Sequence, residues 1–135
     1  MVYITELTLR TGREAASEIT AAVSAAISGS GIKNGMVTVE TPCPATGVLR
    51  MAAGEEKVVY DVVKEMRRIV PARINFANEE SPENAAGCIK SALFGAGVTC
   101  VVKDGALALG KGSGIYFMDY DGPRDRTYHV CVMGE

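Results

Sequence analysis

The sequence predicts an α+β domain in which helices cover one side of a largely antiparallel sheet system. Strand-like and helical segments do not alternate strictly along the chain. Four apolar segments with strand character follow one another near the end, at residues 98–103, 106–109, 115–120 and 127–133. Asp104-Gly105 and Asp121-Gly122 lie between apolar runs, which is the short-range signal for hairpins. A length of 135 residues with 47% hydrophobic content predicts a single domain, 1–135, with a substantial core.

The first half of the chain predicts strands at 2–9, 36–40 and 48–52, the last two flanking a proline-containing break. Thr11 and Glu14 have the spacing of a capping box. Behind them, apolar residues at helical spacing predict a first helix that ends at the glycines: Ala16, Ile19, Val23, Ala26, Ile27, then Gly29 and Gly31.

A second helix is expected to begin near Glu55 and to end at Pro71, because its valines, Met66 and Ile69 recur at helical spacing. Residues 72–80 lack a clear period and predict a loop. Ser81, followed by proline and an acid, predicts the start of a third helix that ends at Gly95. Its inward face is expected to carry Ala85, Cys88, Ile89, Ala92 and Leu93.

Composition excludes several classes of partner. The formal net charge of -2 gives no basis for binding nucleic acid or an anionic membrane. No run approaches the ~18 apolar residues of a membrane span, and the first residues lack the pattern of a signal peptide. We therefore expect a cytoplasmic protein. Its cysteines form no C-x-x-C pair and are expected to be free thiols: Cys43, Cys88, Cys100 and Cys131.

The C-terminal third carries a specific pattern: Leu107 to Gly110, then 119–126 (D-Y-D-G-P-R-D-R), then Gly134-Glu135. It resembles the YjbQ-like family, also described as secondary thiamine-phosphate synthase-like, whose tail reads approximately G-x-L-x-L-G-x-W-Q-x-I-x-x-x-E-x-D-G-P-R-x-R. The resemblance implies a two-sheet, sandwich-like α+β fold, a homotrimer, and a thiamine-phosphate synthase-like transferase activity.

The family's metal-binding histidines are absent at the matching positions. The His-Thr-Ser segment falls on Cys43-Pro44-Ala45, the Asn-Glu pair on Met51-Ala52, and a second histidine near Asn78. A third, in the pattern Ala-His-x-Lys, falls on Cys88. The Trp-Gln pair falls on 112–113 and the tail's glutamate on Asp119, whereas five residues are kept: Asp121, Gly122, Pro123, Arg124 and Arg126.

Cysteine at two of these positions leaves two main alternatives, and a disulfide between the two cysteines is a lesser one in a cytoplasmic protein. Thiolates are good zinc ligands, so Cys43 and Cys88 are candidate ligands together with Asn78, Asp119 or water. The alternative, which we favour, is that both are small inert thiols filling the space that histidines vacate. No cofactor is expected under this alternative, and a divalent metal such as zinc under the other.

Residues 105–111 match the first seven positions of a phosphate-binding loop, but Gly112 replaces the required Ser or Thr and a strand is predicted to follow. We reject that motif. A weaker hypothesis places an anion among basic and polar groups of the glycine-rich stretch and the D-G-P-R turn: Lys111, Ser113, Asp119, Arg124 and Arg126. The alternative is a solvated glycine-rich connection. His129 is expected to be a partnered structural residue.

Together these features predict a divergent YjbQ-like protein, without the family's catalysis, that binds a small phosphorylated ligand. The alternative is an active enzyme, thiamine-phosphate synthase-like or metal-dependent, in which Cys43 and Cys88 replace the histidine ligands.

Overall fold

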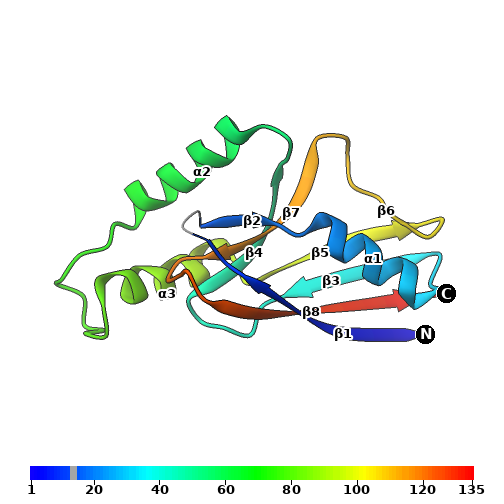
Figure 1. Cartoon of the computed structure of the whole chain (residues 1–135), viewed down its shortest axis with the longest axis horizontal. Helices are drawn as coiled ribbons and strands as arrows, with labels where there is room; N and C mark the ends of the chain where they lie inside the picture. Colours follow the sequence, from blue (N-terminus) through cyan, green and yellow to red (C-terminus); the bar gives the residue numbers. More distant parts are fainter. Residues whose placement is uncertain (13–14) are drawn as a thin grey trace.

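Two antiparallel sheets build the fold in the computed structural model, which describes residues 1–12 and 15–135 (Figure 1). The strand order in the five-stranded sheet is β1 (Val2–Arg10), β8 (Asp125–Gly134), β3 (Gly35–Glu40), β5 (Gly97–Lys103) and β6 (Ala106–Leu107). The order in the three-stranded sheet is β2 (Ala16–Glu18), β7 (Ser113–Asp119) and β4 (Thr46–Ala52). The helices are α1 (Thr20–Ser30), α2 (Glu56–Ile69) and α3 (Pro82–Phe94).

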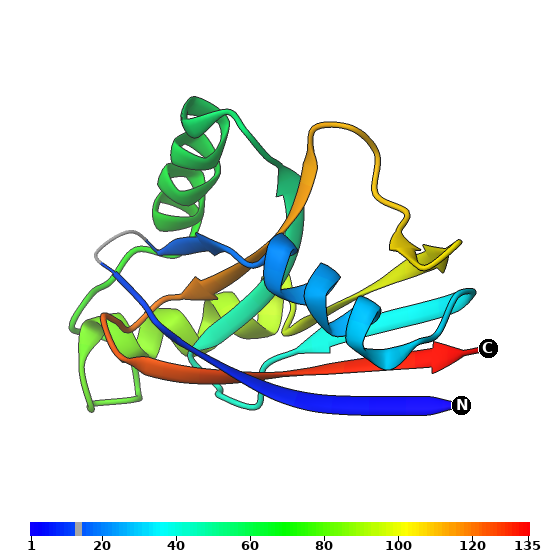
Figure 2. The same cartoon turned by 45° about the vertical axis from the view of Figure 1, so that its right-hand side comes forward.

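The sheets and helices enclose two apolar clusters. One cluster lies where α1 and both sheets meet, with Val23, Phe117 and Tyr128 among its buried side chains. The other joins α2 to the opposite face of the three-stranded sheet, through contacts of Val63 and Met66 with Met118. Figure 2 shows α1 and the three-stranded sheet on the same side of the five-stranded sheet. The predicted α+β class and two-sheet arrangement are therefore confirmed.

Strand β7 is buried on both of its faces. Ile115 and Phe117 face the first cluster, and Tyr116 and Met118 face the second, so four consecutive apolar residues are buried. By contrast, β5 and β8 alternate between buried and more exposed residues. Their apolar sequence runs predict burial on both faces, but within this chain one face of each strand stays uncovered.

The second and third helices begin and end as their sequences predict. The Oγ of Ser81 accepts a hydrogen bond from the backbone N–H of Asn84 at 3.0 Å, which caps α3. The predicted inward face of α3 is wrong by part of a turn, because Ala92 and Leu93 are exposed whereas Ala86, Gly87 and Lys90 are buried. The helix therefore turns a lysine toward the protein interior.

The predicted start of the first helix is also wrong. Glu14 of the expected capping box lies outside the described residues. Residues 16–18 form β2, which pairs with β7 through Ala16 and Met118, and α1 begins only at Thr20. Pairing with a neighbouring strand outweighs the helical periodicity here. Thr11 instead contacts the turn before β8, as described below.

The two Asp-Gly pairs have different roles. Asp104-Gly105 joins β5 to β6 in a hairpin, as predicted. Asp121-Gly122 forms no hairpin, because β7 belongs to the three-stranded sheet and β8 to the five-stranded sheet. This second turn therefore carries the chain from one sheet to the other.

No helix in the described part of the chain has the length and apolar character that a membrane span requires.

Candidate functional site

A buried ion pair occupies the crossover between the sheets. The Asp119 carboxylate accepts hydrogen bonds from Arg126 Nε at 3.0 Å and from Arg126 Nη2 at 3.1 Å. It also accepts the Thr11 hydroxyl at 2.7 Å and the backbone N–H of Asp121 at 3.1 Å. Burial by itself would raise the pKa of Asp119, but these bonds, above all those from Arg126 and Thr11, lower it. Asp119 is therefore a carboxylate with both oxygens engaged.

The same cluster holds the turn rigidly. The Thr11 Oγ1 accepts the backbone N–H of Arg124 at 2.9 Å, and the Thr11 N–H donates to the Arg124 carbonyl at 2.9 Å. A Cβ at Gly122 would lie 2.6 Å from an Asp119 oxygen, so only glycine fits there. The backbone of this turn is thus held against one carboxylate through the N–H groups of Asp121 and Arg124, and the close approach explains the glycine at 122.

Both cysteines of interest lie around this cluster. Arg126 Nη1 donates to Cys43 Sγ at 3.2 Å, and Cys88 Sγ lies 3.7 Å from the side-chain oxygen of Asn84. Asn84 in turn donates to Asp121 at 3.1 Å. The two thiols are free and partly exposed.

Within residues 1–12 and 15–135, no group of three or more His, Cys, Asp or Glu side chains is placed to hold a metal ion. Asp119, which was a candidate third ligand, uses its oxygens for Arg126, Thr11 and the Asp121 N–H. A metal at Cys43 and Cys88 would need ligands from water or from other groups, and it stays a hypothesis.

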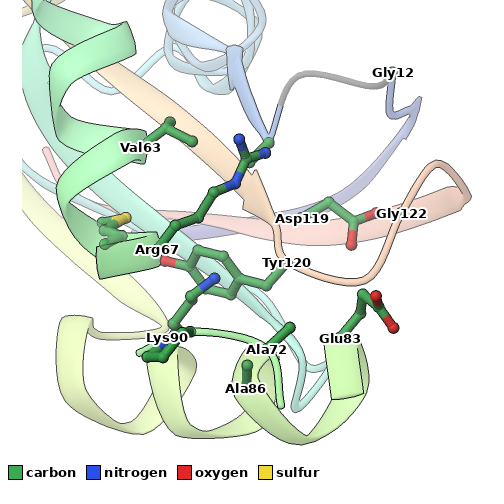
Figure 3. Close-up of a pocket in the computed structure, with 13 residues that line it drawn as sticks. Gly12, Val63, Arg67, Ala72, Glu83, Ala86, Lys90, Asp119, Tyr120 and Gly122 are labelled. Carbon is green, nitrogen blue, oxygen red and sulfur yellow. The ribbon is translucent and has the colours of Figure 1, made fainter. Parts of the chain in front are cut away.

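A cavity of about 420 Å³ lies beside the ion pair, between α2 and α3 (Figure 3). Asp119, Tyr120 and Gly122 form its wall on the β7 side, and α3 contributes Lys90. The remaining lining comes from Gly12, Ala15, Val63, Met66, Arg67, Pro71, Ala72, Glu83 and Ala86.

Lys90 is the most unusual residue of this cavity. It is only 8% exposed, and its Nζ lies 5.6 Å from the centre of the Tyr120 ring. Among the described residues it makes no ion pair and no side-chain hydrogen bond within the usual distances. Burial lowers the pKa of Lys90, and the nearby charge of Arg67 lowers it further. Figure 3 shows the Lys90 amine beside the Tyr120 ring, with the Arg67 side chain extending from α2 away from them.

Tyr120 packs against the Lys90 amine. Burial raises the pKa of Tyr120 to about 12, so its hydroxyl stays protonated. That hydroxyl oxygen is buried without a hydrogen-bond partner in the described part of the chain. The ring therefore presents its face to Lys90 as a neutral platform.

The structure separates the residues predicted to bind an anion. Asp119 and Arg126 pair with each other, and Arg124, with 57% of its side chain exposed, bonds to Asp121 through Nε and Nη2. Ser113 begins β7, about 20 Å from Asp119 at the usual rise of a strand, and Lys111 lies in the turn before that strand. The structure does not bring these two residues to the cluster.

His129 lies on β8 with its Nε2 3.5 Å from a Glu6 carboxylate oxygen, in agreement with a partnered structural role. The strand that follows Gly112 agrees with rejection of the phosphate-loop motif.

Sequence reasoning missed Lys90 and Arg67. Arg67 and Arg68 predict a solvated face of the second helix, and both are exposed, but Arg67 also lines the cavity whereas Arg68 pairs with Glu65. Lys90 follows Ala86 by four residues, so it shares the buried face of α3. A lysine on the small-residue face of a helix is the signal that could have found it.

The fold and the buried crossover cluster define a class of small two-sheet α+β proteins with a polar site between the last two strands. The chain belongs to the family of UPF0047 YjbQ-like proteins, whose model matches residues 5–135. This confirms the family predicted from the C-terminal pattern.

Relatives match over almost the whole chain. The UPF0047 protein of Methanocaldococcus jannaschii is 32% identical over 91% of this chain and 88% of its own length. YugU of Bacillus subtilis is 30% identical over 92% of this chain and 93% of its own.

Solved structures agree with the fold. A YbjQ-like protein of Sulfolobus solfataricus, 23% identical, superposes with a TM-score of 0.93 over 100% of this chain and 99% of that one. A YjbQ/UPF0047 family protein of Clostridium acetobutylicum, 29% identical, gives a TM-score of 0.91 over 96% and 99% of the two chains.

Proposed function

We propose that this protein binds a small phosphorylated compound in the cavity between α2 and α3, without the metal-dependent chemistry that the resemblance implies. One observation carries the proposal: Lys90 and Arg67 both line one cavity, close enough for the Arg67 charge to lower the pKa of Lys90 further than burial does. An anion between them would relieve this repulsion and replace the water that burial removes.

The charge balance of the lining supports an anion. Its acidic residues are Asp119, already neutralised by Arg126, and Glu83, against the two cations Lys90 and Arg67. A volume of about 420 Å³ lies within the range of small-molecule sites. The proposal revises the binding residues expected from the sequence, because Arg126 is fully engaged and Lys111 and Ser113 lie elsewhere.

Thermal denaturation with added phosphate and pyrophosphate tests the proposal. A ligand that binds only the folded state raises the melting temperature with concentration. We expect this rise in the wild type, and its loss in Lys90→Met and Arg67→Gln. Arg68→Gln is the matched control, since Arg68 is on the same helix but pairs with Glu65 in solvent. A wild type that neither anion stabilises would overturn the proposal.

We place Arg124 at the edge of the proposed binding site. It lies two residues after Gly122, which lines the cavity, and its guanidinium remains more than half exposed. In the same experiment we expect Arg124→Ala to weaken the stabilisation by anions while the melting temperature without ligand changes little. A large loss of melting temperature without ligand would assign Arg124 to the turn alone.

A second candidate function is catalysis that uses Cys43 and Cys88. The observation that favours it is the contact of Arg126 with Cys43 Sγ at 3.2 Å, which places one thiol in the polar cluster. It requires a reducing compartment such as the cytoplasm, where the thiols remain reduced. Elemental analysis decides between the two functions. One zinc per chain, lost in Cys43→Ser or Cys88→Ser, would favour the enzyme.

A further inference from the structure

We propose that Lys90 is a nucleophilic amine that forms an imine with a small phosphorylated aldehyde or ketone held in the cavity. This rests on the proposed function and deepens it by naming the chemical class of the ligand. Lys90 is buried and has no ion pair among the described residues, unlike a lysine that only binds an anion or lies in solvent.

Position is the first argument. Only 8% of Lys90 is exposed, yet the residue lines the cavity. Its amine therefore faces a space that a ligand can enter. The groups that act on its amine are the Tyr120 ring and the charge of Arg67, and neither is an anion. The acidic residue of α3 that lines the same cavity is Glu83, which lies two turns before Lys90. An amine in such surroundings has no structural salt bridge to break before it reacts.

Charge is the second argument. Only the neutral amine has the lone pair needed to attack a carbonyl. Burial favours that neutral form, and the Arg67 charge favours it again, as the lowered pKa of Lys90 indicates. A lysine activated by desolvation and by a neighbouring cation is a known route to imine chemistry. The same Arg67 supplies the positive charge that a phosphate needs.

The step balances without an added oxidant or reductant. The nitrogen lone pair forms an N–C bond while the carbonyl π electrons move to oxygen, and a proton passes from nitrogen to that oxygen. The resulting carbinolamine takes up one proton and loses its oxygen as water, and the C=N bond forms as a protonated imine that keeps the remaining N–H. Solvent water supplies that proton, since Glu83 lies two turns away from Lys90.

Borohydride trapping on the intact protein tests the inference. The probe is dihydroxyacetone phosphate, and its matched control is glycerol 3-phosphate, which has a hydroxyl in place of the carbonyl. After reduction, intact mass and peptide mapping should give one adduct, on the peptide that contains Lys90. We expect loss of this adduct in Lys90→Met and its retention in Lys64→Met, because Lys64 is an exposed lysine of α2.

A readout in the wild type covers the case in which Lys90→Met fails to fold. Limited reductive labelling with the probe, followed by peptide mapping, compares Lys90 with Lys57 and Lys64 in one sample. Preferential labelling of Lys90, suppressed by added pyrophosphate, supports the inference. Equal labelling of exposed lysines and none at Lys90 would overturn it.

The two proposals fail separately. If glycerol 3-phosphate stabilises the wild type and no adduct forms on Lys90, the imine is wrong and the anion site stands. If phosphate, pyrophosphate and glycerol 3-phosphate all fail to stabilise the wild type and no adduct forms, both proposals are wrong.

Discussion

Asp119 shows how single side chains fix the crossover between the sheets. Its carboxylate is fully buried and receives four hydrogen bonds, from Arg126 Nε and Nη2, the Thr11 hydroxyl and the Asp121 N–H. Removing the charge would leave the buried Arg126 guanidinium without its counter-ion. Gly122 and the backbone bonds of the turn therefore have a structural explanation that is independent of any ligand.

We predict that Asp119→Asn lowers the free energy of unfolding at neutral pH by about 3–5 kcal/mol, the range for one lost partner of a buried pair. The pKa of Asp119 is lowered in the folded state, so its contribution is present above the unfolded pKa of about 3.9 and is lost as the pH falls through the folded value. The difference between variant and wild type should shrink in acid.

Urea denaturation between neutral and acidic pH measures this effect. Asp125→Asn is the control, because Asp125 pairs with Arg10 at the surface with 88% of its side chain exposed. A difference that is the same at every pH would show that the charge of Asp119 contributes nothing to stability.

At the scale of elements, α3 decides the orientation of Lys90. Ser81 caps the helix and Gly87 lets it lie close to Tyr120, since a Cβ at Gly87 would be 3.0 Å from the Tyr120 Cβ. This close approach turns the helix face that carries Ala86 and Lys90 toward the cavity. The position of the amine thus depends on how the whole helix is seated.

We predict that Ser81→Ala lowers stability by about 1 kcal/mol, because the Asn84 N–H loses its acceptor. Ser81→Asp keeps an acceptor at the cap and should stay close to wild type. Chemical denaturation of both variants measures the effect. Equal loss in the two would assign the role of Ser81 to something other than the cap.

At the scale of the whole molecule, one face of the five-stranded sheet stays uncovered by α1, α2 and α3 (Figures 1 and 2). Its apolar residues follow one another across paired strands, Val2 beside Met133, Met133 beside Met36, and Met36 beside Val101. These four residues and the nearby Ile4 are 48% to 67% exposed. Patches of this kind mark contact surfaces.

We predict that copies of this chain associate through that face, as a homotrimer according to the family resemblance. Light scattering at micromolar concentration measures the mass. Val101→Glu should shift it toward the 14.2 kDa of one chain. Leu93→Glu, at a similarly exposed apolar residue of α3, should leave the mass unchanged. A wild type that scatters as a monomer contradicts the prediction.

The sequence by itself determined the class, the family, most strands, and the two later helices. Those features rest on local signals: alternation in β1, the apolar spacing and Pro71 of α2, and the Ser81 cap of α3. The C-terminal pattern that includes D-G-P-R is also local, and it predicts the family whose model matches residues 5–135.

Tertiary structure alone decided what the local signals could not. Strand pairing with β7 made Ala16–Glu18 a strand, and assignment of β7 and β8 to different sheets made the second Asp-Gly pair a crossover. The cavity joins Arg67 and Lys90, which are 23 residues apart and lie on different helices. No local sequence pattern predicts that these two residues line one cavity, because their proximity depends on how two helices pack against one sheet.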